Sequence, residues 1–218
     1  GVEMIQNRTN HQKTPRLIFW AGIMATLAAI VLVTAFAPLE RTLGANLRVI
    51  LLHGAWVWAG LVFFGLAALA GLAGLTGQRL GIEAAAGVGD WSQPLGWTAM
   101  GYWLTYLPMS LWVMQANWGD FFFDEPRWRI PFTFAVVGVL LQAGLALVNR
   151  PVVTMLANLS FGAALWYSLP GSQAILHPES PVAQSGAASI QVTYGLLLGL
   201  ALLLGIQIVW GLMRFQKK

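Results

Sequence analysis

The chain has no cysteine among its 218 residues, and only 9% of them are charged. Without cysteine there is no disulfide, thiolate metal site, cysteine nucleophile or thioether link to a prosthetic group. Soluble domains carry about 25% charged residues, whereas this chain is 57% hydrophobic. So few charges cannot cover a surface that faces water. We therefore expect a lipid bilayer to face most of the molecule.

Long apolar runs provide the fold prediction. A helix needs about 20 apolar residues to cross the hydrocarbon core, and six runs are long enough or nearly so. They are Leu17–Pro38, Val49–Thr76, Pro94–Gln115, Ile130–Val148, Pro151–Leu169 and Ala188–Phe215. The first lacks a clear small-residue cleavage site, so we expect a membrane helix there rather than a signal peptide. The sequence predicts an all-α integral membrane bundle of six transmembrane helices.

The distribution of lysine and arginine predicts the orientation. With the N-terminus inside, eight basic residues fall on the inner side and four on the outer side, which favours both termini in the cytoplasm. The predicted parts are a cytoplasmic tail at 1–16, a transmembrane domain at 17–215 with outer loops at 39–48, 116–129 and 170–187, and a short cytoplasmic tail at 216–218. The basic residues are scattered rather than gathered on one face, so nucleic acid is not an expected partner.

Little in the chain indicates catalysis or transport. No lysine, arginine, aspartate or glutamate lies in the middle of a run, which disfavours ion-coupled transporters, proton pumps and small-molecule permeases. A phosphate-binding loop, an HExxH motif and a serine nucleophile beside a base are also missing, so we expect no enzyme activity. The long polar side chains within the runs are expected to form interhelical hydrogen bonds. They are Gln142, Asn158, Gln191 and Gln207.

The remaining chemistry gathers on the predicted outer face. His53 lies about one turn inside the outer end of the second run, His177 lies in the last outer loop, and the segment 117–129 between them is rich in aromatic residues. Taken singly, aromatic residues are often interfacial anchors and a loop histidine is often just solvated. Together these groups fit heme. Two imidazoles can ligate iron from opposite sides, aromatic rings can stack on the macrocycle, and arginines can pair with its propionates.

Two patterns in the chain are similar to those of a known family. The first is an outer loop of the form WGxWWxWD(P/A)R. Here Trp118-Gly119 matches its opening and Pro126-Arg127 matches its close, while Phe121-Phe122 stands where two tryptophans are expected. Asp124 takes the place of the third tryptophan, and Glu125 takes that of the aspartate.

The second pattern is RxxxxHxxxxW in the second helix, present as Arg48, His53 and Trp58. The proline expected after this histidine is replaced by Gly54-Ala55, and His177 follows in the expected loop. The chain thus resembles the heme-handling membrane proteins of cytochrome c maturation, the WWD-domain group, and most closely the six-helix CcmC type.

The resemblance implies a protein that binds or presents heme on the outer, periplasmic face of a bacterial cytoplasmic (inner) membrane for cytochrome c assembly. It implies a periplasmic heme chaperone and an ABC-type membrane complex as partners. It assigns iron ligation to His53 and His177 and further heme contacts to Trp118, Phe121, Phe122, Arg127, Trp58 and Arg48. The phenylalanines are expected to face the histidines, and the loop acids to be paired or turned to water.

The alternative is a structural or accessory subunit of a larger respiratory or photosynthetic membrane complex that keeps the scaffold without heme. The substituted tryptophans favour it, and the retained histidines weigh against it.

Overall fold

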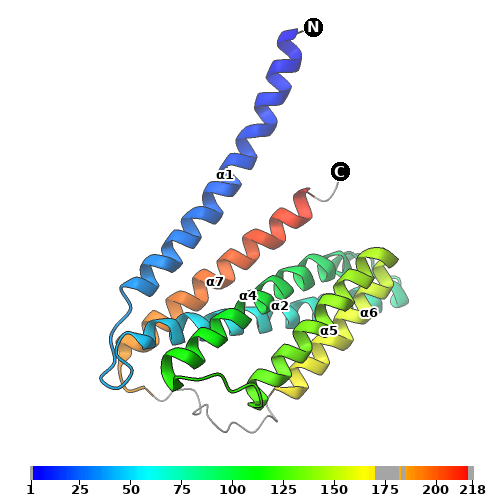
Figure 1. Ribbon diagram of the computed structural model, residues 1–218. Helices are drawn as coiled ribbons and strands as arrows, with labels where there is room; N and C mark the ends of the chain where they lie inside the picture. Colours follow the sequence, from blue (N-terminus) through cyan, green and yellow to red (C-terminus); the bar gives the residue numbers. More distant parts are fainter. Residues whose placement is uncertain (1, 170–181, 183–184, 216–218) are drawn as a thin grey trace.

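The computed structural model describes residues 2–169, 182 and 185–215, with side chains described from residue 16 to 214 within these ranges. The described part is helical and contains no strand, which confirms the predicted all-α fold. Its elements, shown in Figure 1, are α1 Val2–Ala35, α2 Asn46–Leu80, α3 Glu83–Val88, the 3-10 helix η1 Gly89–Trp91, α4 Ser92–Trp118, α5 Pro126–Val148, α6 Pro151–Ser168 and α7 Ala188–Phe215.

Each of the six predicted runs lies in one long helix, but several boundaries differ. The backbone of α1 is helical from Val2, so the helix extends into the segment predicted as a tail. It ends at Ala35 rather than Pro38, because a proline disfavours helical geometry in the residue before it. The helix α2 continues beyond the apolar run and ends against Gly81, whose φ of 69° is the left-handed conformation common after a helix. The helix α5 begins four residues early, at Pro126, a residue well suited to the first helical position.

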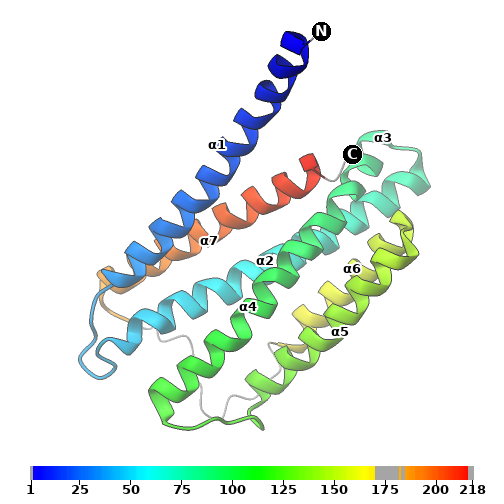
Figure 2. The same ribbon diagram turned by 45° about the horizontal axis from the view of Figure 1, so that its top comes forward.

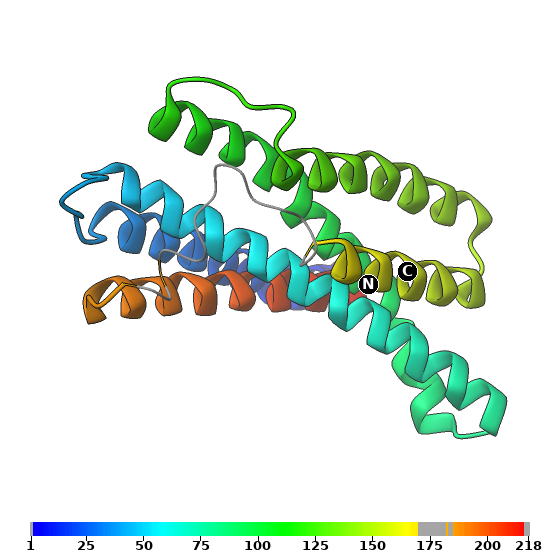
Figure 3. The same cartoon turned by 90° about the horizontal axis from the view of Figure 1, so that it is seen from below.

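The centre of the bundle is the pair α2 and α4, which pack on each other more extensively than any other pair. The helices α5 and α6 lie on one side of this pair, and α7 and α1 lie on the other (Figure 2). The helix α1 contacts mainly α7 and projects beyond it. The short α3 folds back on the end of α2, at the tip of the bundle (Figure 3).

Aromatic residues dominate the core between α2 and α4. Trp103 of α4 is fully buried and contacts Phe64 of α2 edge-on, with ring centroids 5.6 Å apart. The polar atoms of the buried rings bond to neighbouring helices. Trp103 Nε1 donates to the carbonyl of Pro131 at 3.0 Å, and the Tyr102 hydroxyl donates to the carbonyl of Ala201. The core therefore joins four helices by hydrogen bonds as well as by packing.

Three of the four predicted interhelical polar side chains form such bonds. Gln142 Nε2 donates to Asn158 Oδ1 at 2.9 Å, which joins α5 to α6, and Gln207 of α7 donates to Thr26 Oγ1 of α1 at 3.1 Å. Gln191 is different, because its Nε2 donates to the carbonyl of Ser185, just before its own helix. That position is exposed and lies near the start of α7.

Within the described residues, four helices are long and apolar enough to cross a membrane, which indicates a membrane protein. They are Arg16–Ala35 of α1, Asn46–Leu80, Pro126–Val148 and Ala188–Arg214 of α7. The other two long helices, α4 and α6, are not among them, and α4 buries much of its surface inside the bundle.

The two ends of the bundle carry different segments, and we call them the terminal end and the loop end. The terminal end carries the start of α1, the end of α7, the segment 81–91 and the α5–α6 turn at 149–150. The loop end carries the connections at 36–45 and 119–125 (Figure 2).

Candidate functional site

His53 lies on α2, in the half of the bundle nearest the loop end. Its side chain is half-buried, and its ring lies against Tyr106 of α4 with centroids 5.5 Å apart and planes inclined by 41°. Tyr106 is itself buried and contacts Trp103 at 5.1 Å. The packing of α4 on α2 therefore limits how the imidazole can turn.

Gly54 and Ala55 follow His53 at the position where the WWD-domain pattern has a proline. A Cβ placed on Gly54 would lie 3.3 Å from the ring of Tyr194 on α7, tighter than most side-chain contacts. The next residue, Ala55, has no exposed surface. Small residues at these two positions let α7 approach α2 beside the histidine, where a larger side chain would separate the helices.

Arg48 binds to the connection at 36–45. Its Nε donates to the carbonyl of Ala37 at 3.0 Å. In the same connection Glu40 accepts hydrogen bonds from the backbone N–H of Leu43 and of Thr42, at 2.8 and 2.7 Å, and these bonds lower the pKa of the Glu40 carboxyl. Arg48 therefore holds this loop in place, with its remaining N–H donors available for other partners.

The connection at 119–125 begins with a turn that the sequence dictates. Gly119 has a φ of 72° and its N–H bonds to the carbonyl of Gln115, so it terminates α4 in the left-handed conformation that glycine adopts without strain. Asp120 Oδ1 accepts the backbone N–H of Phe121. Phe122 then folds back toward Trp118, with ring centroids 6.3 Å apart in an edge-on arrangement.

The other aromatic rings of this connection form a series that continues along α5. Phe121 stacks on Phe123 at 5.9 Å, Phe123 contacts Trp128 at 6.0 Å, and Trp128 stacks on Phe132 at 5.9 Å. We call Phe121, Phe123, Trp128 and Phe132 the aromatic series. Trp128 is buried, whereas the other three are 44–55% exposed. Most of the aromatic series therefore lies on the surface of the protein. The i, i+4 spacing of Trp128 and Phe132 is the sequence pattern that predicts the contact in its helical part.

The three loop acids do not behave alike. Asp120 and Asp124 are exposed and face water, as predicted. Glu125 is only 4% exposed, so it is not turned to water, and for this residue the other predicted arrangement, pairing, stays a prediction. Its carbonyl accepts the backbone N–H of Trp128 and of Arg129, both at 2.9 Å. Glu125 is buried because it is the residue at which the chain enters α5.

The structure brings some of the predicted heme-binding residues to one end of the bundle. Arg127 is half-buried in the first turn of α5, at the same end as Trp118 and His53. In the described part of the chain, Phe121 and Phe122 make no ring contact with His53. Trp58, by contrast, is 48% exposed and its nearest aromatic partner is Trp166 of α6, at 6.2 Å.

Metal ligands are sparse around this end. His177 lies outside the described residues, so the pairing of the two imidazoles stays a prediction. Within the described ranges, no group of three or more histidine, aspartate or glutamate side chains could hold a metal ion.

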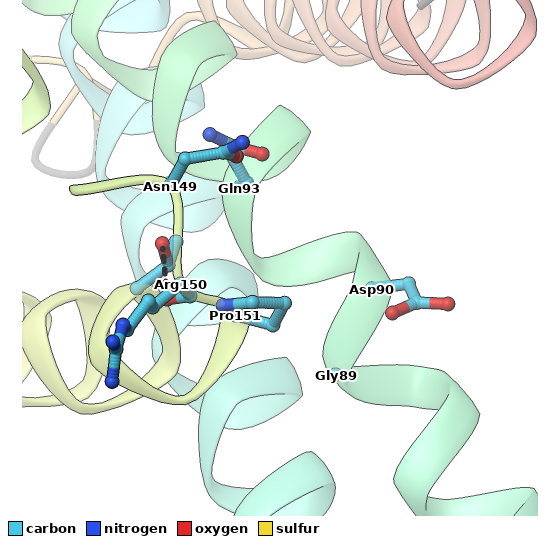
Figure 4. A pocket seen from close by; sticks show the side chains of 7 residues that line it. Gly89, Asp90, Gln93, Asn149, Arg150 and Pro151 are labelled. Carbon is cyan, nitrogen blue, oxygen red and sulfur yellow. Dashed lines mark hydrogen bonds between the residues drawn. The ribbon is translucent and has the colours of Figure 1, made fainter. Parts of the chain in front are cut away.

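A second site lies at the terminal end, where sequence motifs gave no indication. A pocket of about 90 Å³ opens between the start of α4 and the α5–α6 turn (Figure 4). It is lined by Gly89, Asp90, Gln93, Asn149, Arg150, Pro151 and Thr154. These residues come from two segments that are far apart in the sequence. The only sequence pattern that could have predicted the pocket is that both segments are polar and lie next to apolar runs.

Searches of protein-family models, of curated proteins and of solved structures return no match to this chain. The resemblance to the WWD-domain group therefore rests on the residues of the two patterns.

Proposed function

We propose that this is a membrane protein that binds heme at the loop end of its bundle and presents it for cytochrome c assembly, without enzyme activity of its own. The observation that carries the proposal is the position of His53. Its imidazole lies on a helix of the central pair, half-buried against Tyr106, at the end to which α4 and α5 bring an aromatic connection.

The described residues fit part of a heme site. A half-buried imidazole is a standard iron ligand, and the ring of Tyr106 holds it in one region of space. Trp118 and Phe122 offer flat apolar faces that could exclude water from one side of a porphyrin. Arg127, half-buried in the first turn of α5, would pair with a propionate at the rim. The opposite axial position falls to His177, as the resemblance implies.

Not every residue assigned from the resemblance has an equal part in this proposal. Arg48 acts first as a support for the 36–45 connection, through its bond to Ala37. Trp58 lies on the exposed side of α2 beside Trp166, so its role is to anchor the helix in lipid. Heme is the cargo of such a protein, and the iron it carries supplies the redox chemistry of the recipient cytochrome.

The proposal includes the membrane placement. Six helices would cross the bilayer, with α4 largely enclosed by its neighbours, and the loop end would be periplasmic in a bacterial inner membrane. The excess of basic residues near the terminal end supports this orientation. A periplasmic heme chaperone and an ABC-type membrane complex are the partners that the resemblance implies.

A second function is favoured by the aromatic series. Three of its four rings are 44–55% exposed, on the connection and on α5. Such a surface suits contact with lipid or with a neighbouring subunit. The second candidate is therefore an accessory subunit of a larger respiratory or photosynthetic membrane complex that does not bind heme.

The absorbance spectrum of the full chain, purified in detergent from cells supplied with heme, separates the two functions. We expect a Soret band that changes in His53→Ala and in His177→Ala and disappears in the double variant. His11→Ala is the matched control, because it removes a histidine of the predicted cytoplasmic tail, and its spectrum should equal that of the wild type. A folded wild-type protein without a Soret band, or a double variant with an unchanged one, would refute heme binding and favour the subunit.

A further inference from the structure

The pocket at the terminal end combines opposite charges with neutral polar groups. Arg150 and Asp90 lie on either side of it, with Pro151 between them (Figure 4). No ion pair joins the two charges in the described part of the chain. Gln93, Asn149 and Thr154 complete the polar lining. The two charged groups are therefore not paired with each other and lie on opposite sides of Pro151 (Figure 4).

Apolar side chains that face outward flank this pocket. Leu147 and Val148, which end α5, are 88% and 51% exposed, and Val152 and Val153, which begin α6, are 45% and 38% exposed. The helix α5 is one of the four apolar enough to cross a membrane. Its end therefore lies where hydrocarbon gives way to lipid headgroups.

The size of the pocket suits one small polar group. About 10–15 Å³ of such volume holds one water molecule, so 90 Å³ holds several waters or one phosphate group. Arginine binds phosphate with paired N–H donors, and side-chain amides add further donors. A carboxylate close by opposes a second negative charge but attracts an ammonium group.

We propose that this pocket binds the headgroup of a zwitterionic phospholipid, with the phosphate at Arg150 and a primary ammonium at Asp90. The amides of Gln93 and Asn149 donate to the phosphate oxygens, and the exposed valines and Leu147 accommodate the acyl chains. An anionic headgroup without an ammonium leaves the Asp90 carboxylate facing its phosphate, so it binds more weakly. The proposal requires that the bundle lies in a membrane, and it is independent of heme.

Native mass spectrometry of the full chain released from detergent tests this proposal. The probes are phosphatidylethanolamine and phosphatidylglycerol at equal concentrations, in separate and mixed additions. Inorganic phosphate and soluble glycerophosphoethanolamine are added as competitors. We expect the wild type to retain phosphatidylethanolamine about tenfold better than phosphatidylglycerol, the effect of one charge-assisted contact. Equal retention of the two lipids, or binding of soluble phosphate without either lipid, would overturn the proposal.

Two variants locate the site. Arg150→Gln should weaken retention of both lipids about tenfold, because both carry the phosphate. Asp90→Asn should remove the preference for phosphatidylethanolamine while keeping phosphatidylglycerol. Arg79→Gln is the matched control, since Arg79 is an exposed arginine at the same end that does not line the pocket. If Arg150→Gln and Asp90→Asn both behave like Arg79→Gln, while circular dichroism shows all three folded, the lipid is bound elsewhere and the proposal is wrong.

Discussion

Replacement of Asn158 by alanine should lower the free energy of unfolding by more than the loss of its packing alone, because its hydrogen bonds are lost as well. Asn158 is 4% exposed on α6. It accepts a hydrogen bond from Gln142 at 2.9 Å, and its Nδ2 donates to the carbonyl of Ser92 at 2.9 Å and to the Ser92 hydroxyl at 3.1 Å. The Ser92 hydroxyl in turn donates to the carbonyl of Ala67 at 3.0 Å. A single amide thus connects α5, α6, α4 and, through Ser92, α2.

The expected cost follows from these bonds. An interhelical hydrogen bond in a membrane protein contributes about 0.6 kcal/mol, so three of them contribute about 2 kcal/mol. The variant also leaves Gln142 Nε2 buried without its acceptor, which costs about 1 kcal/mol more. We therefore expect Asn158→Ala to lower the free energy of unfolding by about 3 kcal/mol.

The measurement is the free energy of unfolding in mixed micelles, with SDS as denaturant and tryptophan fluorescence as the signal. Asn117→Ala is the matched control. Asn117 is also an asparagine in a helix, but its Nδ2 donates to the carbonyl of Val113 within α4, so its loss should cost about 0.5 kcal/mol or less. Equal costs at the two positions would show that the amide does not link the helices. A cycle combining Asn158→Ala with Ser92→Ala should give a coupling of about 0.6 kcal/mol.

Three further predictions address packing, ionisation and orientation. Gly71→Ala should lower stability by about 1–3 kcal/mol in the same assay, because its Cβ would lie 2.6 Å from a backbone oxygen of α6, whereas Gly144→Ala, with nothing within 4 Å, should not. The pKa of the Glu40 carboxyl, measured by NMR, should lie below that of glutamate in a model peptide, because the backbone N–H groups of Leu43 and Thr42 donate to the charged carboxylate. This stabilisation of the loop should be lost as the pH falls through the lowered pKa. A midpoint at or above the peptide value would contradict this. In intact cells, an impermeant thiol reagent should label Ser172→Cys, which lies outside the described residues, but not Gly87→Cys. The chain has no cysteine of its own to confuse the result, and the opposite pattern would reverse the proposed orientation.

The sequence predicted the helices well because length and apolar composition determine them. The run Ala188–Phe215 matches α7 at both ends. The short α3 was missed, since Glu83–Val88 is too brief and too weakly patterned to be read as a helix. It forms because Gly77 of α2 lets the backbone at Ala85 and Ala86 come close, and a Cβ there would overlap them. Such tertiary support is invisible in local propensity.

The candidate site was less predictable than the fold. The position of His53 near the loop end follows from its place in the second run, but its contact with Tyr106 depends on how α4 packs against α2. The direction of the aromatic connection was not predictable either. Phe121 stacks on Phe123, which continues toward α5. That path depends on the turn at Gly119 and on the burial of Glu125. Both are local backbone features that a motif does not record.

The middle of the bundle meets the demand of an apolar environment for internal hydrogen bonding at several tryptophans. In hydrocarbon, polar groups must find partners inside the protein, and two tryptophans donate to backbone carbonyls of neighbouring helices. Trp103 donates to Pro131, and Trp166 donates to the carbonyl of Leu61 at 3.1 Å. No charged residue lies between the loop-end histidine and the Asn158 amide in the described helices. A packed aromatic core of this kind holds α2 and α4 in fixed register. A fixed register of this kind is what the proposed heme-binding scaffold would need at its loop end.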